Sequence, residues 1–194
     1  PSNLQLLEPT IRERACQILD DLPVGEDIDW VDKVSIELTT MTLATLFDFP
    51  WEERRKLTRW SDITTAAPET GIVESYEARR QELIECAMYF KGLWDQRINE
   101  EPKNDLISIM AHSPATRDMP FLEFLGNLLL LIVGGNDTTR NSISGGVLAL
   151  NQNPDEYRKL NGDPSLIASM VPEIIRWQTP LTHMRRTALQ DWDI

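Results

Sequence analysis

The residues best suited to chemistry lie in one short segment, residues 134–139, which reads Gly-Gly-Asn-Asp-Thr-Thr. Asp137 is followed directly by the hydroxyl group of Thr138. An acid can exchange protons with water and a hydroxyl can pass a proton to a reacting oxygen, so the pair could form a proton relay. Gly134 and Gly135 lack side chains, which lets a flat ligand lie close to the backbone. The segment could therefore place a proton relay beside a groove.

The same glycines leave two interpretations of the local structure open. Each glycine costs about 1 kcal/mol relative to alanine inside a helix, so two in a row favour a helix end. Asp137 or Thr138 would then cap a second helix after a tight turn. The alternative is one long helix over residues 120–151 that is locally opened at the glycines. In that case a threonine hydroxyl takes over backbone hydrogen bonding and leaves a groove and a kink.

Helices must position this segment, because apolar residues recur every three to four positions along most of the chain. The pattern predicts a mainly α fold in a single domain. Helices are expected over about residues 3–21, 30–47, 51–65, 72–100, 106–112, 120–151, 154–160 and 166–178, and residues 187–194 could form a strand.

The composition argues against several classes of function. The 194 residues include 19 Lys and Arg against 31 Asp and Glu, so the basic face of a nucleic-acid binder is missing. Cys16 and Cys86 fit a reducing compartment better than a disulfide framework. His112 and His183 lack metal-ligand spacing to each other or to a cysteine, which argues against a zinc site. The longest apolar stretch, residues 128–133, is shorter than the about 20 residues of a membrane span, and we expect a cytoplasmic protein.

Residues 134–139 resemble a signature of the cytochromes P450. That signature is alanine or glycine, glycine, any residue, an acid, threonine, and threonine or serine, and it lies in a central helix that crosses the distal face of haem b. The resemblance implies that Asp137 is the acid of the relay and that Thr138 is the hydroxyl that hydrogen-bonds the bound dioxygen. It also implies that Gly134 and Gly135 form the groove where oxygen fits.

Glu173 and Arg176 carry a second likeness. Taken alone, Glu-Ile-Ile-Arg is an i,i+3 helical ion pair worth about a few tenths of a kcal/mol. Its place after the glycine–threonine segment and just before Thr179 and Pro180 is similar to that of the Glu-x-x-Arg helix of the same family. The resemblance implies a structural role for both residues.

Residues 180–188 are similar to the strand that follows this helix in the family. Their Arg-x-Ala element implies that Arg186 pairs with a haem propionate, a charge-assisted contact that suits arginine. The neighbouring Arg185 could take that role instead. His183 could join the propionate network or be an ordinary exposed histidine, and Leu181 is at a position that lines the family's substrate pocket.

Further likeness indicates a substrate class. Residues 29–40, 45–50, 136–145 and 177–185 look like a bacterial soluble subfamily that hydroxylates alkanes and fatty acids at the terminal carbon. Leu130 and Val133 would line an apolar substrate pocket, with plain helical core packing as the alternative. The resemblance implies that O2 supplies an oxygen atom to a terminal C–H bond of a medium-chain alkane or fatty acid. Electrons would come from NAD(P)H through a ferredoxin reductase and a ferredoxin.

Two other functions remain open. One is a P450 that acts on a terpene or a sterol side chain. The other is a non-catalytic helical interaction domain, in which Asp137 and Thr138 are ordinary caps and the helix breaks at the glycines.

The axial ligand of the family is a cysteine in a Phe-x-x-Gly-x-x-x-Cys-x-Gly loop, which this sequence does not contain. Cys16 and Cys86 lie on expected helices, and we expect both to be inert, buried or half-buried thiols. No residue is therefore assigned as a metal ligand. We expect residues 1–194 to be a single partial P450 domain, an internal fragment that is inactive by itself and poorly packed along its long apolar helix.

Overall fold

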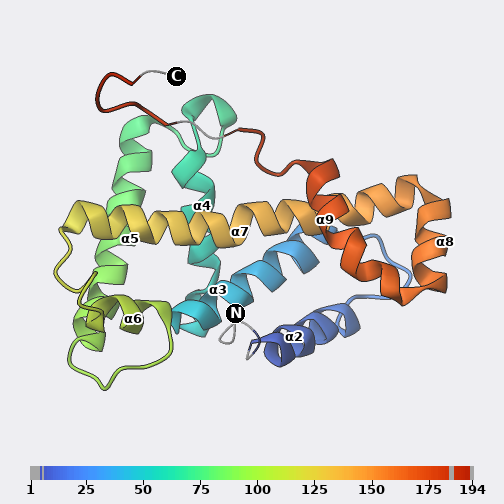
Figure 1. The fold of residues 1–194 in the computed structure, drawn as a ribbon, viewed down its shortest axis with the longest axis horizontal. Coiled ribbons are helices and arrows are strands. Elements are labelled where there is room, and N and C mark those ends of the chain that lie inside the picture. Colours follow the sequence, from blue (N-terminus) through green and yellow to red (C-terminus); the bar gives the residue numbers. More distant parts are fainter. Residues whose placement is uncertain (1–4, 6, 184–185, 193–194) are drawn as a thin grey trace. The chain divides into compact units, whose positions relative to one another are not determined.

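The computed structural model describes residue 5, residues 7–183 and residues 186–192 (Figure 1). In that part of the chain all regular structure is helical, which confirms the mainly α fold expected from the sequence. The α-helices are α2 (Glu8–Asp20), α3 (Glu37–Phe47), α4 (Arg55–Thr65), α5 (Tyr76–Arg97), α6 (Leu106–His112), α7 (Phe121–Gln152), α8 (Pro154–Gly162) and α9 (Ile167–Gln178). The shorter elements are the π-helix η1 (Val31–Ile36) and the 3-10 helices η2 (Trp51–Glu53), η3 (Pro68–Thr70) and η4 (Pro164–Leu166).

The chain divides into two compact units, residues 1–140 and residues 141–194, and the boundary falls inside α7. Unit 1 contains α2 to α6 and the part of α7 up to Arg140. Unit 2 contains the rest of α7, α8, η4, α9 and the segment that follows α9.

Several helix ends have a clear local cause. Ser75 precedes α5, and its hydroxyl accepts a hydrogen bond from the backbone N–H of Ala78. Asp105 does the same for α6 by accepting from Ser108 N–H at 2.8 Å. Both are N-caps, which satisfy backbone donors that the first turn leaves unpaired. Asp48 ends α3 in the left-handed region, at φ 47°.

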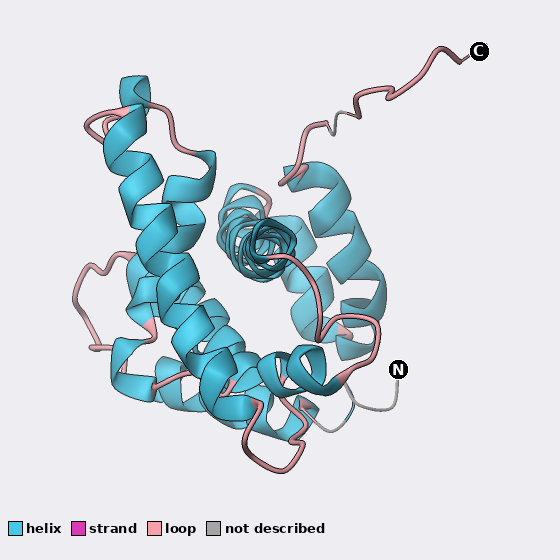
Figure 2. Ribbon diagram, turned by 90° about the vertical axis from the view of Figure 1, so that its left-hand side faces the viewer, coloured by secondary structure: helices cyan, strands magenta, loops and turns pink. Residues whose placement is uncertain are grey.

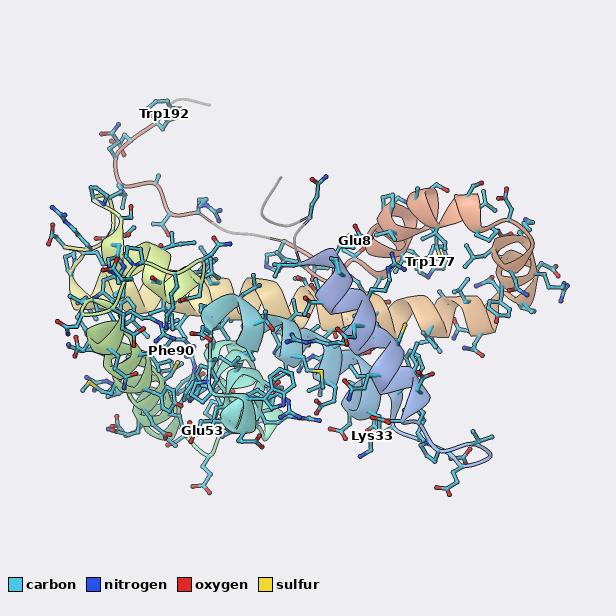
Figure 3. All side chains as sticks on the ribbon, turned by 90° about the horizontal axis from the view of Figure 1, so that it is seen from below. Glu8, Lys33, Glu53, Phe90, Trp177 and Trp192 are labelled. Atoms are coloured by element: carbon cyan, nitrogen blue, oxygen red, sulfur yellow. The ribbon has the colours of Figure 1, made fainter. Side chains whose placement is uncertain are left out.

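The core of unit 1 is built around aromatic rings. Phe47, Phe49 and Trp60 surround Phe90 of α5, with ring centroids 5.3 Å, 5.5 Å and 5.8 Å from the Phe90 ring. Figure 3 shows Phe90 among the helices of this unit. Aromatic pairs of this kind contribute about 0.5–1.5 kcal/mol beyond the area that they bury. The core therefore fixes α3, α4 and α5 together, and α7 packs against it.

Unit 2 is held together at the second pair of glycines in α7. A Cβ atom on Gly146 would lie 2.9 Å from Cδ1 of Ile174, and one on Gly145 would overlap the side chain of Gln178. Both partners lie on α9, so the glycines allow two helix backbones to approach closely. Among the described residues of unit 2, these two glycines alone are buried.

The expectation of a strand at residues 187–194 is wrong for the part that is described. Residues 186–192 form bends and irregular coil, and Figure 2 shows helices and loops but no strand in the described chain. A strand needs hydrogen bonds to a neighbouring strand, which the described residues do not supply. Among the described helices, none combines the length and the apolar character that a membrane span needs. The described residues also contain no group of three or more His, Cys, Asp and Glu side chains that could hold a metal ion.

Candidate active site

The chemistry-bearing segment lies in the middle of one uninterrupted helix. α7 runs from Phe121 to Gln152 through both adjacent glycines, so the interpretation as two helices joined by a turn is wrong. The hydroxyl group of Thr138 donates to the carbonyl oxygen of Gly134, one turn earlier, at 3.1 Å. The helical cost of the glycines is offset by the burial of apolar neighbours such as Leu128 and Ile132.

One face of α7 is buried in unit 1. Phe124, Leu128, Ile132 and Asn136 follow one another at intervals of four residues, and all four side chains are buried. This spacing places them on one side of the helix. The first three belong to the apolar core cluster that also contains Phe47 and Phe90. This face anchors the helix.

The opposite face of α7 is uncovered. Leu122, Gly126, Leu130 and Gly134 are all exposed, again at intervals of four residues, and Thr138 continues the row. Leu130 is 67% exposed, whereas Ile132 two residues away is 0% exposed. We call the row of Leu130, Gly134 and Thr138 the uncovered strip. It combines an apolar side chain, a bare backbone and a hydroxyl group.

The two central glycines have different surroundings. A Cβ atom on Gly134 would meet nothing within 4 Å. A Cβ atom on Gly135 would lie 2.6 Å from Cδ2 of Leu43, which is itself buried on α3. Gly135 therefore has a packing function between α7 and α3 that the sequence did not indicate. Its role in an oxygen groove stays a prediction, and Gly134 is the glycine that faces open space.

Asn136 was not singled out from the sequence, although it is fully buried between the glycines and Asp137. Its Oδ1 accepts a hydrogen bond from the hydroxyl group of Thr39 at 2.9 Å. Thr39 also contacts the carbonyl oxygen of Ser35 at 3.0 Å, at the end of the π-helix η1. The sequence contained one signal for a buried role of this residue, because a polar side chain continues the four-residue spacing of an otherwise apolar helix face. The bond fixes the rotation of α7 about its axis relative to η1 and α3.

Asp137 takes part in an ion-pair network. Nη2 of Arg140 donates to Oδ1 of Asp137 at 2.5 Å, and Nη1 of Arg140 donates to Oδ1 of Asp62 on α4 at 3.0 Å. The exposed fractions of the side chains are 23% for Asp137, 15% for Arg140 and 31% for Asp62. The spacing of Asp137 and Arg140 is a helical i,i+3 signal, but nothing in the sequence linked either to Asp62.

Burial raises the pKa of Asp137 above its ordinary value, and the neighbouring charge of Asp62 raises it further. The positive charge of Arg140 opposes both effects. A carboxyl group in this setting binds a proton more readily than an exposed aspartate does. The direction of the shift suits a group that takes up and gives up protons.

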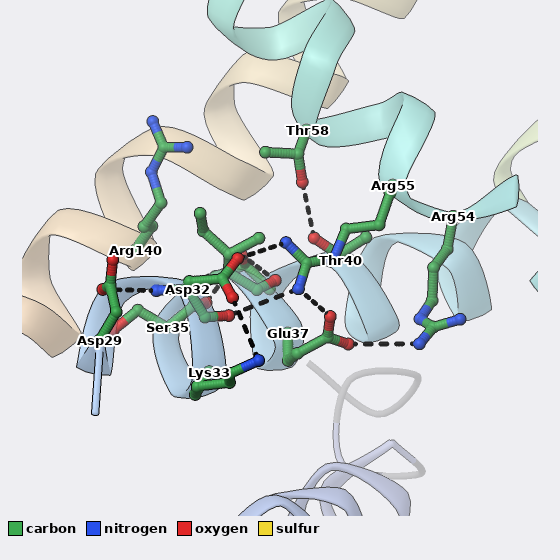
Figure 4. Close-up of polar contacts among 12 residues, drawn as sticks. Asp29, Asp32, Lys33, Ser35, Glu37, Thr40, Arg54, Arg55, Thr58 and Arg140 are labelled. Carbon is green, nitrogen blue, oxygen red and sulfur yellow. Dashed lines mark hydrogen bonds and ion pairs between the residues drawn. The ribbon is translucent and has the colours of Figure 1, made fainter. Parts of the chain in front are cut away.

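The helix that carries Asp62 is fixed to η1 and α3 by charges and by a buried hydrogen bond. Figure 4 shows Arg55 of α4 beside Asp32 and Glu37, and Arg54 beside Glu37. Arg55 lies 3.0 Å from Asp32, and its hydrogen bond is the main cause that lowers the pKa of Asp32. The hydroxyl groups of Thr40 and Thr58 lie 2.7 Å apart in the buried contact between α3 and α4.

In unit 2, Glu173 and Arg176 form the expected i,i+3 ion pair on α9. Nε and Nη2 of Arg176 donate to the two carboxylate oxygens of Glu173 at 2.7 Å and 2.6 Å. Both side chains are more than half exposed. Glu173 and Trp177 also line an open groove of about 530 Å³ within this unit. The wider structural role of the pair stays a prediction.

The remaining predicted site residues fall into both units. Leu130 and Val133 lie on α7 in unit 1, Val133 being half-buried. Leu181, His183 and Arg186 lie exposed in the coil after α9 in unit 2. Arg185, the alternative partner of a propionate, lies outside the described residues. The roles of these residues toward substrate and haem stay predictions.

The two cysteines differ from each other. Cys86 is buried in the core of unit 1, and burial raises the pKa of its thiol to about 12. It is therefore protonated at neutral pH and unsuited to bind a metal. Cys16 is exposed on α2, so the expectation that it is buried or half-buried is wrong. Cys16 lies in the charged sequence Arg-Glu-Arg-Ala-Cys-Gln of an amphipathic surface helix, which explains its exposure.

Two solved structures match the chain closely in fold. CYP153D17 from Sphingomonas sp. is 51% identical with a TM-score of 0.87, and the match covers 100% of this chain and 48% of that one. Cytochrome P450-153 from Novosphingobium aromaticivorans is 49% identical with a TM-score of 0.85, and the match covers 100% of this chain and 46% of that one. No family model matches the chain.

Curated relatives also match the whole chain. Linalool 8-monooxygenase of Pseudomonas putida is 32% identical over 195 residues, which are 48% of its length. Steroid C26-monooxygenase of Mycolicibacterium smegmatis is 33% identical over 196 residues, which are 44% of its length. The chain thus spans about half the length of the curated relatives that it matches.

Proposed function

We propose that this chain, which has the cytochrome P450 fold over about half the length of its relatives, is part of a haem-thiolate monooxygenase. The two curated relatives, linalool 8-monooxygenase and steroid C26-monooxygenase, are monooxygenases by name. The observation that carries the proposal is the uncovered strip of α7, which presents Gly134 and Thr138 beside the half-buried acid Asp137 on an unbroken helix.

The residues of the uncovered strip fit one face of a haem. A Cβ atom at Gly134 would meet nothing within 4 Å, so a flat macrocycle can approach the backbone there. Leu130 supplies apolar surface, and Thr138 supplies the one hydroxyl group of the strip. Bound haem would supply oxygen activation, for which thiolate-ligated iron is suited. We assign the thiolate to neither cysteine of this chain, and we propose that Arg186 and His183 contact the propionates.

Asp137 and Thr138 would then hold a proton and transfer it. Asp137 is partly exposed and can exchange a proton with water, and its raised pKa favours the protonated form that a general acid needs. Thr138 donates its own hydrogen to the Gly134 carbonyl oxygen, and a hydroxyl oxygen can also accept a hydrogen bond. Release of that bond lets the hydroxyl group donate in turn. The pair can therefore hold a proton near the strip and pass it on.

The proposed substrate is a medium-chain alkane or fatty acid that is hydroxylated at its terminal carbon. Support comes from the 49% and 51% identity to the two solved structures and from the apolar side chains Leu130 and Val133 beside the strip. Leu181 is the further residue proposed to contact the substrate. We propose that a ferredoxin and its NAD(P)H-dependent reductase supply electrons in the cytoplasm.

A terpene or a sterol side chain is the second candidate substrate. The names of the two curated relatives, a linalool 8-monooxygenase and a steroid C26-monooxygenase, favour it. The third possibility, a non-catalytic helical domain, required the helix to break at Gly134 and Gly135. The continuity of α7 counts against that possibility.

Product analysis with the haem-loaded full-length protein tests the proposal. Octane, decanoic acid, linalool and cholesterol are each incubated with a ferredoxin, its reductase and NADH, and the products are identified by mass spectrometry. We expect terminal alcohols from octane or decanoic acid, and a loss of about 10²–10⁴-fold in turnover in the Asp137→Asn variant. Oxidation of linalool or cholesterol alone would favour the second substrate class. A reduced protein whose Soret band does not shift with carbon monoxide would refute the enzyme class.

A further inference from the structure

Arg140 uses the two ends of its guanidinium group for two different carboxylates. One terminal nitrogen contacts Asp137 on the same helix, and the other contacts Asp62, which lies 78 residues earlier in the chain. Lysine has a single nitrogen on a flexible stem, whereas the planar fork of arginine can hold two acceptors in a fixed geometry. The contact therefore links the direction of the Asp137 carboxyl group to the position of α4.

We propose that Arg140 and Asp62 are positioning residues for the proton relay: Arg140 holds the Asp137 carboxyl group, and Asp62 holds Arg140 and shares its positive charge. This inference rests on the proposed function of Asp137. It adds two residues outside the glycine–threonine segment, neither of which belongs to the uncovered strip.

The charges of the three groups do not balance. Two carboxylates share one guanidinium group, so one negative charge is in excess when all three are ionised. Arg140 and Asp62 are the described charged groups that act on Asp137, from its own helix and from α4 respectively. All three side chains are at least two-thirds buried, so solvent screens them incompletely. Asp62 thus prevents Arg140 from fully neutralising Asp137.

The position of Asp62 is itself fixed. α4 is tied to η1 and α3 by the ion pairs of Arg54 and Arg55, and its buried face packs in the core through Leu57, Trp60 and Ile63. Arg140 is therefore held at its far end by a helix that cannot shift without disturbing the core. This anchor gives Asp137 a defined orientation instead of a freely rotating exposed carboxyl group.

Charge-removing substitutions at the two residues should act in opposite directions. Asp62→Asn removes a negative charge and leaves Arg140 to Asp137 alone, so the pKa of Asp137 should fall. Arg140→Gln removes the positive charge, so the pKa of Asp137 should rise. If protonated Asp137 delivers the proton, turnover declines as pH rises through this pKa. The decline should therefore move to lower pH in Asp62→Asn and to higher pH in Arg140→Gln.

The experiment uses the full-length protein and two readouts. Infrared difference titration, with the spectrum of the Asp137→Asn variant subtracted, follows the protonation of the Asp137 carboxyl group without turnover. The pH profile of substrate hydroxylation follows the reaction. Arg140→Lys keeps the charge and should shift both readouts less than Arg140→Gln does. Asp118→Asn is the matched control, because Asp118 is 84% exposed and pairs with Arg117 outside this network.

Opposite infrared shifts in Asp62→Asn and Arg140→Gln, with no shift in Asp118→Asn, would support the positioning pair. Shifts in the same direction, or none, would overturn it whatever the turnover data show. Infrared shifts as expected with an unmoved pH profile of hydroxylation would instead count against the proposed use of Asp137 in the reaction, while the positioning of its carboxyl group would stand.

Discussion

Between residues 122 and 138, α7 has two faces that share a spacing of four residues but differ in burial and in the type of side chain. The buried face places Phe124, Leu128 and Ile132 in the core of unit 1 and ends on Asn136, which is bonded to Thr39. The uncovered strip carries Leu130, Gly134 and Thr138 on the opposite side. The buried face supplies the stability that lets the helix tolerate two adjacent glycines. The uncovered strip is therefore not needed for packing in this core, and we propose that it serves oxygen chemistry.

A similar difference separates the two units. Unit 1 buries an aromatic core, with Phe47, Leu57, Phe90 and Ile132 fully inside it. In the described part of unit 2, large apolar side chains such as Trp177, which is labelled in Figure 3, remain exposed. Leu130 and Leu148 on α7 are also exposed, and the poor packing expected along this helix stays a prediction. Among the described residues, the buried large apolar side chains therefore all lie in unit 1.

The largest effect on stability is expected from the buried face. Ile132→Ala removes a fully buried side chain and should lower the free energy of unfolding by about 2–5 kcal/mol, because it leaves a cavity in a packed core. Leu130→Ala, two residues away on the uncovered strip, is the matched control and should change it by less than about 0.5 kcal/mol. Urea unfolding of the protein followed by circular dichroism measures both. Equal losses in the two variants would show that the faces are not distinct.

A smaller effect distinguishes the adjacent glycines. Both alanine variants gain about the same helical propensity, but the new methyl group at 135 meets the buried side chain of Leu43. Gly135→Ala should therefore be less stable than Gly134→Ala by about 1–3 kcal/mol, the usual cost of overpacking. Gly134→Ala should stabilise the helix and yet lower turnover, because the methyl group projects toward the proposed haem face. A Gly134→Ala variant with unchanged turnover would remove the functional reason for that glycine.

The sequence predicted most of the helices, because their signals are local. The ends of α3, α6 and α9 agree with the ends expected from the apolar periodicity. The start of α5 was placed too early, since Ser75 begins the helix later than the apolar pattern indicated. The π-helix η1 was missed because periodicity alone does not distinguish a π-turn from an α-turn.

The candidate site was predicted in its motif but not in its surroundings. Asp137 and Thr138 stood out by type and spacing. The contact of Gly135 with Leu43, the bond between Asn136 and Thr39, and the link from Arg140 to Asp62 join residues that lie 78 to 97 positions apart. Such contacts arise from the packing of α7 on α3 and α4, which no local pattern encodes. The acid and hydroxyl could be recognised in the sequence, whereas the residues that orient them required the structure.

The most direct test of the central claim is the fate of oxygen in the Thr138→Ala variant of the full-length protein. Oxygen consumption, hydrogen peroxide and hydroxylated product are measured together, with Ser144→Ala on the same helix as a control. We expect Thr138→Ala still to consume oxygen but to release more peroxide and less product, because the hydroxyl group proposed to relay protons beside the strip is lost. Unchanged product per oxygen consumed would contradict the assignment of the uncovered strip as the oxygen-handling face.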